Sequence, residues 1–148
     1  GYYKDEAETV EALTPDGWLK TGDLGYVDEK NRIFITGRKK NLIILSNGEN
    51  VSPEELENKF AGHDIVGDVL VYSEDNVITA EFFPAAEAVK NLSAAETEAK
   101  LLETVDSVNK TVSSAKAIRR VLLRDAEFEK TTSKKIKRSQ SAQGRRIR

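Results

Sequence analysis

The sequence predicts an α+β fold, a small mixed domain with a central β-sheet flanked by helices and preceded by a β-hairpin. Three observations lead to this class. Two stretches alternate apolar and polar residues on either side of a turn, as hairpins do. Two others begin with helix-capping residues and continue with apolar residues at helical spacing. A short alternating stretch after the second helix supplies one more strand.

The first hairpin is expected over residues 18–37, "WLKTGDLGYVDEKNRIFITG". Apolar residues alternate with other residues up to Tyr26, "DEKN" forms the turn, and Ile33 and Ile35 alternate on the return. Residues 37–41, "GRKKN", then make a polar break. The apolar run "LIIL" and the turn signal "SNGEN" follow it.

The first helix has a well-marked start. Ser52 suits the N-cap, Pro53 suits the first helical position, and Glu55 stands three residues after the cap. Leu56 and Phe60 then share one face, and the helix is expected to be short.

The remaining elements follow in order. Residues 66–83 predict two strands around the turn "SEDN". A longer helix is expected from Ser93 to Val112, because it opens with a capping box and has an apolar face. Residues 117–125 alternate well enough for a strand. Residues 139–148 show no apolar periodicity, so we expect disorder there.

Composition excludes several classes of site. Hydrophobic residues make up 39% of the 148, and no apolar run approaches the roughly 20 residues that span a bilayer. The chain has no cysteine, which excludes disulfides, thiolate nucleophiles and thiolate metal sites. His63 is the single histidine, so we expect no metal site in this chain. There is no methionine, even at position 1, and we therefore expect a piece of a longer protein.

Charge is distributed unevenly along the chain. The net charge is −2, but residues 116–148 hold 12 Lys or Arg against three Asp or Glu, and residues 1–115 hold 11 against 22. A basic end on an acidic body suggests contact with a nucleic acid or an anionic ligand, or closure between two parts of one protein.

Three segments carry residues suited to chemistry, although each has a simpler interpretation by itself. Asp23 in "KTGD" could accept hydrogen bonds from a diol such as ribose, or could satisfy turn amides. The glycine loop "SNGEN" could meet an anionic or amide-bearing ligand, or be an ordinary loop before an N-cap. The run "KTTSKKIKR", 130–138, mixes hydroxyls and lysines that suit phosphate oxygens, or is a solvated basic tail.

In sequence and in order, "GWLKTGD", "FITGRKKNLIILSNGENVSPEELE" and "KTTSKKIKR" resemble the last three core motifs of the adenylate-forming (AMP-binding) enzymes. That superfamily includes acyl-CoA synthetases, adenylation domains of peptide synthetases, and luciferases. The resemblance implies that residues 1–37 end a large N-terminal domain, 38–40 form a hinge, and 41–138 form a C-terminal lid. The segments "LSNGENVSPEELE" and "FEKTTSKKIKR" look most like bacterial long-chain fatty acid–CoA ligases.

The resemblance also implies site residues. Lys135 matches the catalytic lysine of the final motif, although Lys134 replaces the usual glycine and leaves two adjacent candidates. We favour Lys135 because it directly precedes Ile136 and lies three residues before Arg138, as in the family. The other implied roles are nucleotide binding by Asp23 and Arg38, the hinge at Lys40, and a CoA pantetheine channel lined by Ser46, Asn47, Gly48 and Glu49.

The implied function is the ATP-dependent, AMP-forming ligation of a carboxylic acid, here a long-chain fatty acid, to CoA. ATP, CoA and Mg²⁺ would be bound mainly by the missing N-terminal domain, so the isolated chain is expected to be inactive. A cytoplasmic location is expected, and the full-length enzyme could associate peripherally with a membrane. One alternative is an adenylation domain that loads a carrier protein. A nucleic-acid-binding module is disfavoured, because residues 129–148 contain no aromatic residue among the basic ones.

Overall fold

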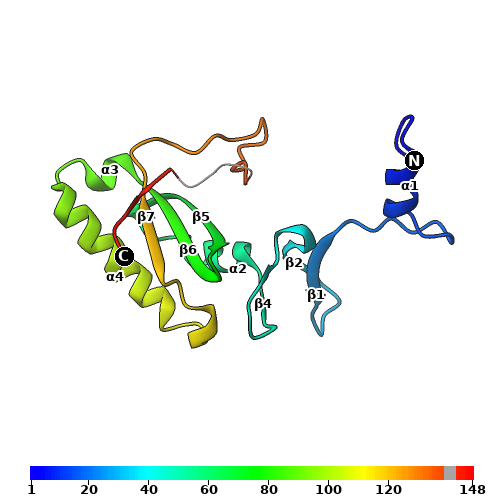
Figure 1. Ribbon diagram of the computed structural model, residues 1–148, viewed down its shortest axis with the longest axis horizontal. Coiled ribbons are helices and arrows are strands. Elements are labelled where there is room, and N and C mark those ends of the chain that lie inside the picture. Colours follow the sequence, from blue (N-terminus) through cyan, green and yellow to red (C-terminus); the bar gives the residue numbers. More distant parts are fainter. Residues whose placement is uncertain (139–142) are drawn as a thin grey trace. The chain divides into compact units, whose positions relative to one another are not determined.

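The computed structural model describes residues 1–138 and 143–148, and the chain forms two compact units, Gly1–Leu42 and Ile43–Arg148. The predicted α+β class is confirmed. The elements, most of which are labelled in Figure 1, begin with α1 (Glu6–Ala12), β1 (Asp23–Val27), β2 (Ile33–Arg38), the 3₁₀ turn η1 (Lys39–Asn41), β3 (Ile43–Ile44), β4 (Asn50–Val51) and α2 (Pro53–Asn58). They continue with β5 (Val66–Glu74), β6 (Val77–Pro84), α3 (Ala86–Val89), α4 (Ala94–Asn109), η2 (Ser114–Lys116), β7 (Arg120–Leu123) and β8 (Arg145–Arg146).

The first unit contains the predicted hairpin. β1 and β2 pair antiparallel, and a bulge interrupts the register between Leu24 and Gly25. A side chain at Gly25 would place a Cβ only 2.4 Å from the carbonyl oxygen of Phe34, so the close approach of the strands requires glycine there. The hairpin runs through Arg38, so the polar break expected from residue 37 starts later than predicted. Helix α1 was not predicted, because it buries no residue and therefore has no apolar face to recognise.

The second unit is built on a four-stranded mixed sheet in the order β5-β6-β7-β8. β5 and β6 pair antiparallel, β6 and β7 pair parallel, and β7 and β8 pair antiparallel. The turn between β5 and β6 places Asp75 and Asn76 at φ values of 52° and 60°, the left-handed pair that suits a tight hairpin. The predicted turn at "SEDN" is therefore confirmed.

Helices α2 and α4 bury their apolar faces against this sheet, and α4 is seen beside it in Figure 1. The predicted capping box is present at the start of α4, where Ser93 and Glu96 satisfy each other's backbone amides. Phe60 packs edge-on against Phe82 with ring centroids 5.0 Å apart. Full burial of one such apolar side chain contributes roughly 1.5–3 kcal/mol. The core includes Leu56, Phe60, Val71, Ile78, Ala80, Phe82, Leu101, Val105, Val108, Ile118 and Val121.

The C-terminal segment corrects the sequence prediction. Disorder was expected over 139–148, but residues 143–148 join the sheet through β8. Ile147 packs against the core, and Arg145 and Arg148 form ion pairs with acidic side chains of α4. A two-residue strand is too short to show periodicity, which is why the pattern was missed. The part of the prediction that concerns 139–142 lies outside the described residues.

No helix in the described part of the chain has both the length and the apolar character needed to cross a bilayer.

Candidate functional site

The basic run at 130–138 forms a small hairpin. The Thr131 amide donates to the Lys135 carbonyl at 2.8 Å, and the Lys134 amide donates to the Thr131 carbonyl at 2.8 Å. Below the turn, the Lys137 amide donates to the Glu129 carbonyl at 2.9 Å. The interpretation of this run as a solvated tail is therefore wrong, and Lys135 stands at the end of a defined turn.

Lys134 occupies the left-handed position of this turn, with a φ of 60°. Glycine reaches such a conformation without steric cost, whereas other L-residues pay roughly 1–2 kcal/mol. The geometry shows why glycine would suit this place and that lysine adopts the same backbone at a cost. Lys134 is thus the turn residue of the hairpin, and Lys135 follows it.

Changing Lys134 to glycine is expected to stabilise the hairpin by about 1 kcal/mol, the relief of left-handed strain less the added chain entropy. That free energy corresponds to about fivefold slower hydrogen exchange in the variant, at the amides of residues 131 and 134. The matched control is Lys135→Gly, which places glycine where no positive φ occurs and should speed exchange. Faster exchange in Lys134→Gly would show that the turn does not adopt the left-handed conformation in solution.

Most cations of the run are held by acidic side chains. Lys130 Nζ lies 2.7 Å from Asp68 Oδ2, and Lys137 Nζ lies 3.3 Å from Glu129 Oε2. Lys135 is exposed, and its ammonium group makes no hydrogen bond or ion pair with the residues that the structure describes. The hairpin therefore presents Lys135 as a cation available to an anionic ligand.

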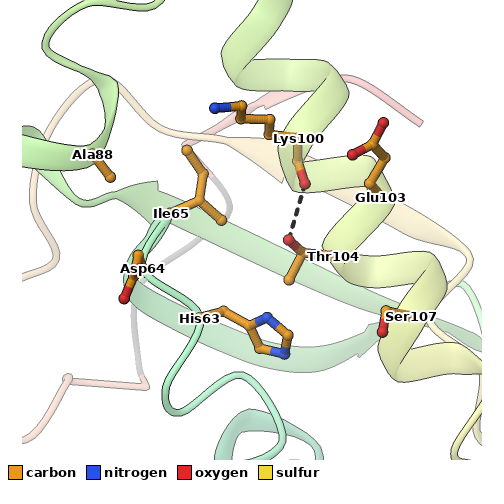
Figure 2. A pocket seen from close by; sticks show the side chains of 8 residues that line it. All are labelled: His63, Asp64, Ile65, Ala88, Lys100, Glu103, Thr104 and Ser107. Atoms are coloured by element: carbon orange, nitrogen blue, oxygen red, sulfur yellow. Dashed lines mark hydrogen bonds between the residues drawn. The ribbon is translucent and has the colours of Figure 1, made fainter.

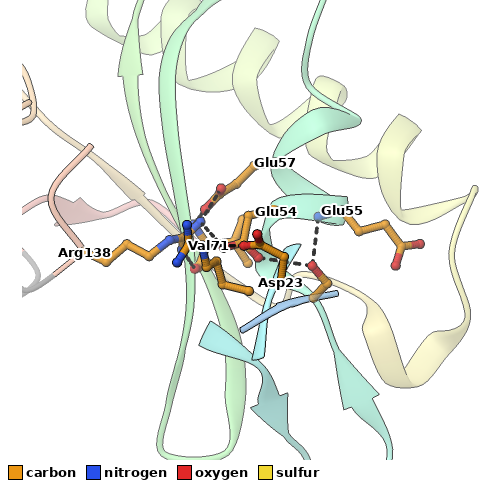
Figure 3. A network of polar contacts seen from close by, with 8 residues as sticks. Asp23, Glu54, Glu55, Glu57, Val71 and Arg138 are labelled. Carbon is orange, nitrogen blue, oxygen red and sulfur yellow. Dashed lines mark hydrogen bonds and ion pairs between the residues drawn. The ribbon is translucent and has the colours of Figure 1, made fainter. Parts of the chain in front are cut away.

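Arg138 joins the end of the hairpin to α2 and β5, as Figure 3 shows. Its Nη2 lies 2.5 Å from Glu57 Oε2 in α2, and its Nη1 donates to the Val71 carbonyl in β5 at 3.1 Å. The other Glu57 oxygen accepts the Val71 amide at 2.7 Å. Burial raises the pKa of Glu57, while the Val71 amide and the Arg138 guanidinium oppose that shift by stabilising the carboxylate. One arginine and one glutamate thus join the hairpin, α2 and the edge of the sheet.

The predicted channel residues form the loop of a second small hairpin in the same unit. β3 and β4 pair antiparallel and are anchored by the buried side chains of Ile43 and Val51. Gly48 has a φ of 81° and donates its amide to the Leu45 carbonyl at 2.8 Å, so the turn depends on a glycine conformation. The members of this loop are Ser46, Asn47 and Gly48, which are exposed, and Glu49, which is partly buried.

Asp23 and Arg38, the predicted nucleotide-binding pair, are brought together by the first hairpin. They are cross-strand partners in β1 and β2, and Arg38 Nε lies 2.7 Å from Asp23 Oδ1. The Arg38 side chain is 60% exposed, so an ion pair of this kind adds little to stability. Both residues belong to the first unit, whereas Lys135 and the Ser46–Glu49 loop belong to the second.

Lys40 lies in η1, a single 3₁₀ turn closed by the Leu42 amide, which donates to the Lys39 carbonyl at 3.3 Å. The two compact units divide between Leu42 and Ile43. A short turn beside that division is a suitable place for dihedral change, and the hinge at Lys40 stays a prediction.

A separate pocket lies beside α4 and contains none of the predicted site residues (Figure 2). His63 lines it and is partly buried, as expected for an ordinary histidine. The Thr104 hydroxyl in the same wall donates to the Lys100 carbonyl at 2.9 Å, so helix backbone already satisfies it. The wall consists of His63, Asp64, Ile65, Ala88, Lys100, Glu103, Thr104 and Ser107.

Comparison with known families shows what the three motif segments belong to. Residues 40–144 match the family model of the AMP-binding enzyme C-terminal domain. The chain belongs to the AMP-binding enzyme family. The identification made from the motifs is thereby confirmed, and the match begins at Lys40, within the predicted hinge.

Several members of the AMP-binding family align with this chain over part of their own length. A long-chain-fatty-acid–CoA ligase of Mycobacterium tuberculosis is 46% identical over 74 residues, which is 50% of this chain and 12% of that protein. The 4-coumarate–CoA ligase-like 4 of Oryza sativa subsp. japonica is 38% identical over 138 residues, 93% of this chain and 24% of that protein. The structure of o-succinylbenzoate coenzyme A synthetase from Bacillus subtilis with AMP is similar at a TM-score of 0.70 and 26% identity, over 98% of this chain and 28% of that one. This member of the AMP-binding enzyme family therefore spans about a quarter or less of the length of these relatives.

Sequence reasoning missed the acidic residues that hold the lysine hairpin of this AMP-binding family member. Arg138 was recognised as a motif residue without a role, and Asp68 and Glu57 were not singled out. One signal was present in the sequence. The segment "PEELE" places Glu54 and Glu57 on one helix face, and such an acidic face is a suitable partner for the basic run at 130–138.

Proposed function

We propose that this chain is the C-terminal lid of an ATP-dependent, AMP-forming acyl-CoA ligase. The observation that carries the proposal is Lys135, an exposed cation at the motif position of a defined hairpin in which Lys130, Lys137 and Arg138 are engaged by acids. Two relatives named as CoA ligases, at 46% and 38% identity, support the same reaction class.

In the first half-reaction, a substrate carboxylate attacks the α-phosphorus of ATP. A carboxylate O–P bond forms, the bond to the bridging oxygen of the β-phosphate breaks, and pyrophosphate leaves with the electron pair. Negative charge builds on the phosphate oxygens and the leaving group, and the Lys135 ammonium stabilises it electrostatically. Lys135 also holds two anions together, which lowers the entropic part of the barrier.

The nucleotide is held on the first unit. The Asp23 carboxylate accepts hydrogen bonds from the ribose hydroxyls, and Arg38 fixes that carboxylate through its 2.7 Å ion pair and contacts the nucleotide. A magnesium ion would accompany the ATP phosphates and offset their charge.

In the second half-reaction, the CoA thiol loses its proton to solvent, and its sulfur attacks the carbonyl carbon of the acyl-adenylate. A C–S bond forms, the C–O bond to the phosphate breaks, and AMP leaves. This step places no new charge on pyrophosphate, so it does not need Lys135. Reorientation of the second unit about Lys40 would withdraw the lysine and bring Ser46–Glu49 to the pantetheine channel, since a short polar turn can absorb the dihedral change.

The proposed acid is a long-chain fatty acid and the proposed acceptor is CoA. The support for both is the 46% identity to a long-chain-fatty-acid–CoA ligase, which covers half of this chain. A carrier protein bearing phosphopantetheine presents the same thiol and is the second acceptor to test.

The test joins this chain to its large domain and compares it with the chain alone. The joined protein is expected to form acyl-CoA from palmitate, ATP and CoA, whereas the isolated chain forms none because it lacks most of the ATP site. Acyl-CoA formation by the isolated chain would contradict the lid assignment. Transfer of acyl groups to a carrier protein with no transfer to CoA would establish the alternative acceptor.

A further inference from the structure

The segment that carries Lys135 begins and ends at one buried carboxylate. Glu81 lies in β6 and is 1% exposed. Its Oε1 accepts the amides of Gln143 and Gly144 at 2.9 and 2.6 Å, and Arg124 Nη1 donates to it at 3.4 Å. Arg124 directly follows β7, and Gly144 directly precedes β8. Glu81 therefore touches the chain where it leaves the sheet before Lys135 and where it rejoins the sheet afterwards.

Arg124 makes further contacts with both ends of the segment that carries Lys135. Its side chain is 4% exposed, its Nη2 donates to Gln143 Oε1 at 3.0 Å, and its Nε donates to the Ala126 carbonyl at 3.0 Å. Its guanidinium also lies over the buried ring of Phe128, 4.2 Å from the ring centroid. One arginine thus fixes the first turn of the outgoing segment and the start of the returning strand.

Gly144 permits the close approach of the returning strand. A Cβ at this position would lie 2.9 Å from Leu122 Cβ and 3.1 Å from Glu81 Oε1. A larger residue would push the strand away from the carboxylate, so the cluster depends on Gly144 as well as on the two charges.

The ion pair in this cluster is not by itself evidence of added stability. A buried ion pair costs desolvation that apolar residues of similar size do not incur, so its net stabilisation is small compared with that of an apolar replacement. Lys135 has no side-chain partner among the described residues, so its place is set only by the backbone that carries it. Tying both ends of that backbone to one point reduces the positions that the cation can sample.

We propose that Glu81 is a positioning residue for Lys135: with Arg124, Gln143 and Gly144 it closes the base of the segment and holds the lysine hairpin in its reactive place. The inference rests on the proposed function of Lys135. A misplacement of about 1 Å can cost about a hundredfold in rate, so a distant closure of this kind can matter to chemistry.

The test uses two variants of the full-length enzyme that disturb the cluster by different physical means. Glu81→Gln keeps the shape and removes the charge, whereas Gly144→Ala keeps both charges and displaces the strand. Arg145→Ala is the matched control, because it removes an exposed ion pair to Glu98 from β8 and leaves the Glu81 contacts in place. The readouts are hydrogen exchange of a peptide covering 130–137, with β5 and β6 as the internal reference, and the rates of both half-reactions.

Both cluster variants are expected to exchange at least about tenfold faster over 130–137 while β5 and β6 stay protected, and to lose about ten- to a hundredfold in the kcat of adenylation with the CoA step unchanged. Arg145→Ala should change neither readout. Unchanged exchange and adenylation in Gly144→Ala would overturn the inference, even if Glu81→Gln unfolds the sheet. An inactive Lys135→Ala beside active cluster variants refutes the positioning role alone, whereas a fully active Lys135→Ala refutes the proposed function.

Discussion

Alanine in place of Lys135 is expected to slow adenylation by about a hundred- to a thousandfold, the usual cost of removing one preorganised charge from a developing anion. The CoA step, measured with supplied acyl-adenylate, should stay within about twofold of the unchanged enzyme, because no pyrophosphate charge develops there. The measurement is a pair of half-reaction assays on the enzyme with its large domain. Folding should be unaffected, since the Lys135 side chain is exposed and makes no ion pair with the described residues.

The neighbouring lysine provides the matched control for this result. Lys134 occupies the left-handed turn position and is expected to contribute backbone geometry, so Lys134→Ala should reduce adenylation far less than Lys135→Ala. A severe loss in Lys134→Ala with normal activity in Lys135→Ala would mean that the motif is aligned one residue too far along. Equal losses in both half-reactions for Lys135→Ala would refute a role confined to adenylation.

Proline in place of Lys40 is expected to slow the CoA step by at least about tenfold while adenylation changes much less. Proline fixes its own φ and disfavours helical dihedrals in the residue before it. That residue is Lys39, the first member of the 3₁₀ turn beside the division between the two units. The substitution therefore restricts the dihedrals that a reorientation between half-reactions would have to change.

Lys40→Ala separates the backbone effect from the side chain. It removes the ammonium group but leaves the dihedrals free, so both half-reactions should remain near their original rates. The comparison is made by single-turnover measurement of each half-reaction. If Lys40→Pro supports both steps at normal rates, the hinge lies elsewhere or the lid does not reorient here.

The elements that the sequence predicted correctly are those whose signals are local. The capping box at Ser93 and the apolar spacing after it identify α4, and the turn at Asp75 and Asn76 identifies the β5–β6 hairpin. Capping and turn chemistry act within a few residues, so they can be read without the fold. Elements without such signals were missed, namely α1, which buries no residue, and the two-residue strand β8.

The sequence predicted only those site residues that lie in the three motif segments. The three segments indicated Asp23, Arg38, Ser46–Glu49 and Lys135, and family membership follows from the match over residues 40–144. The backbone conformation of Lys134 could not be read from the sequence. Its φ of 60° shows that lysine takes the left-handed turn position at a cost, because a backbone dihedral is a property of the folded turn.

The sequence by itself determined the family, the main hairpins and helices, and the identity of the candidate cation. The tertiary structure alone decided which contacts hold the hairpin that carries this cation. Arg138 meets Glu57 across 81 residues of sequence, and Arg124 meets Glu81 across 43. The lone glutamate in the apolar run "VITAEFF" indicates a buried charge, which requires a partner. The local sequence does not identify that partner. Which charges meet over such separations depends on strand order and register, and these arise only when the whole sheet assembles.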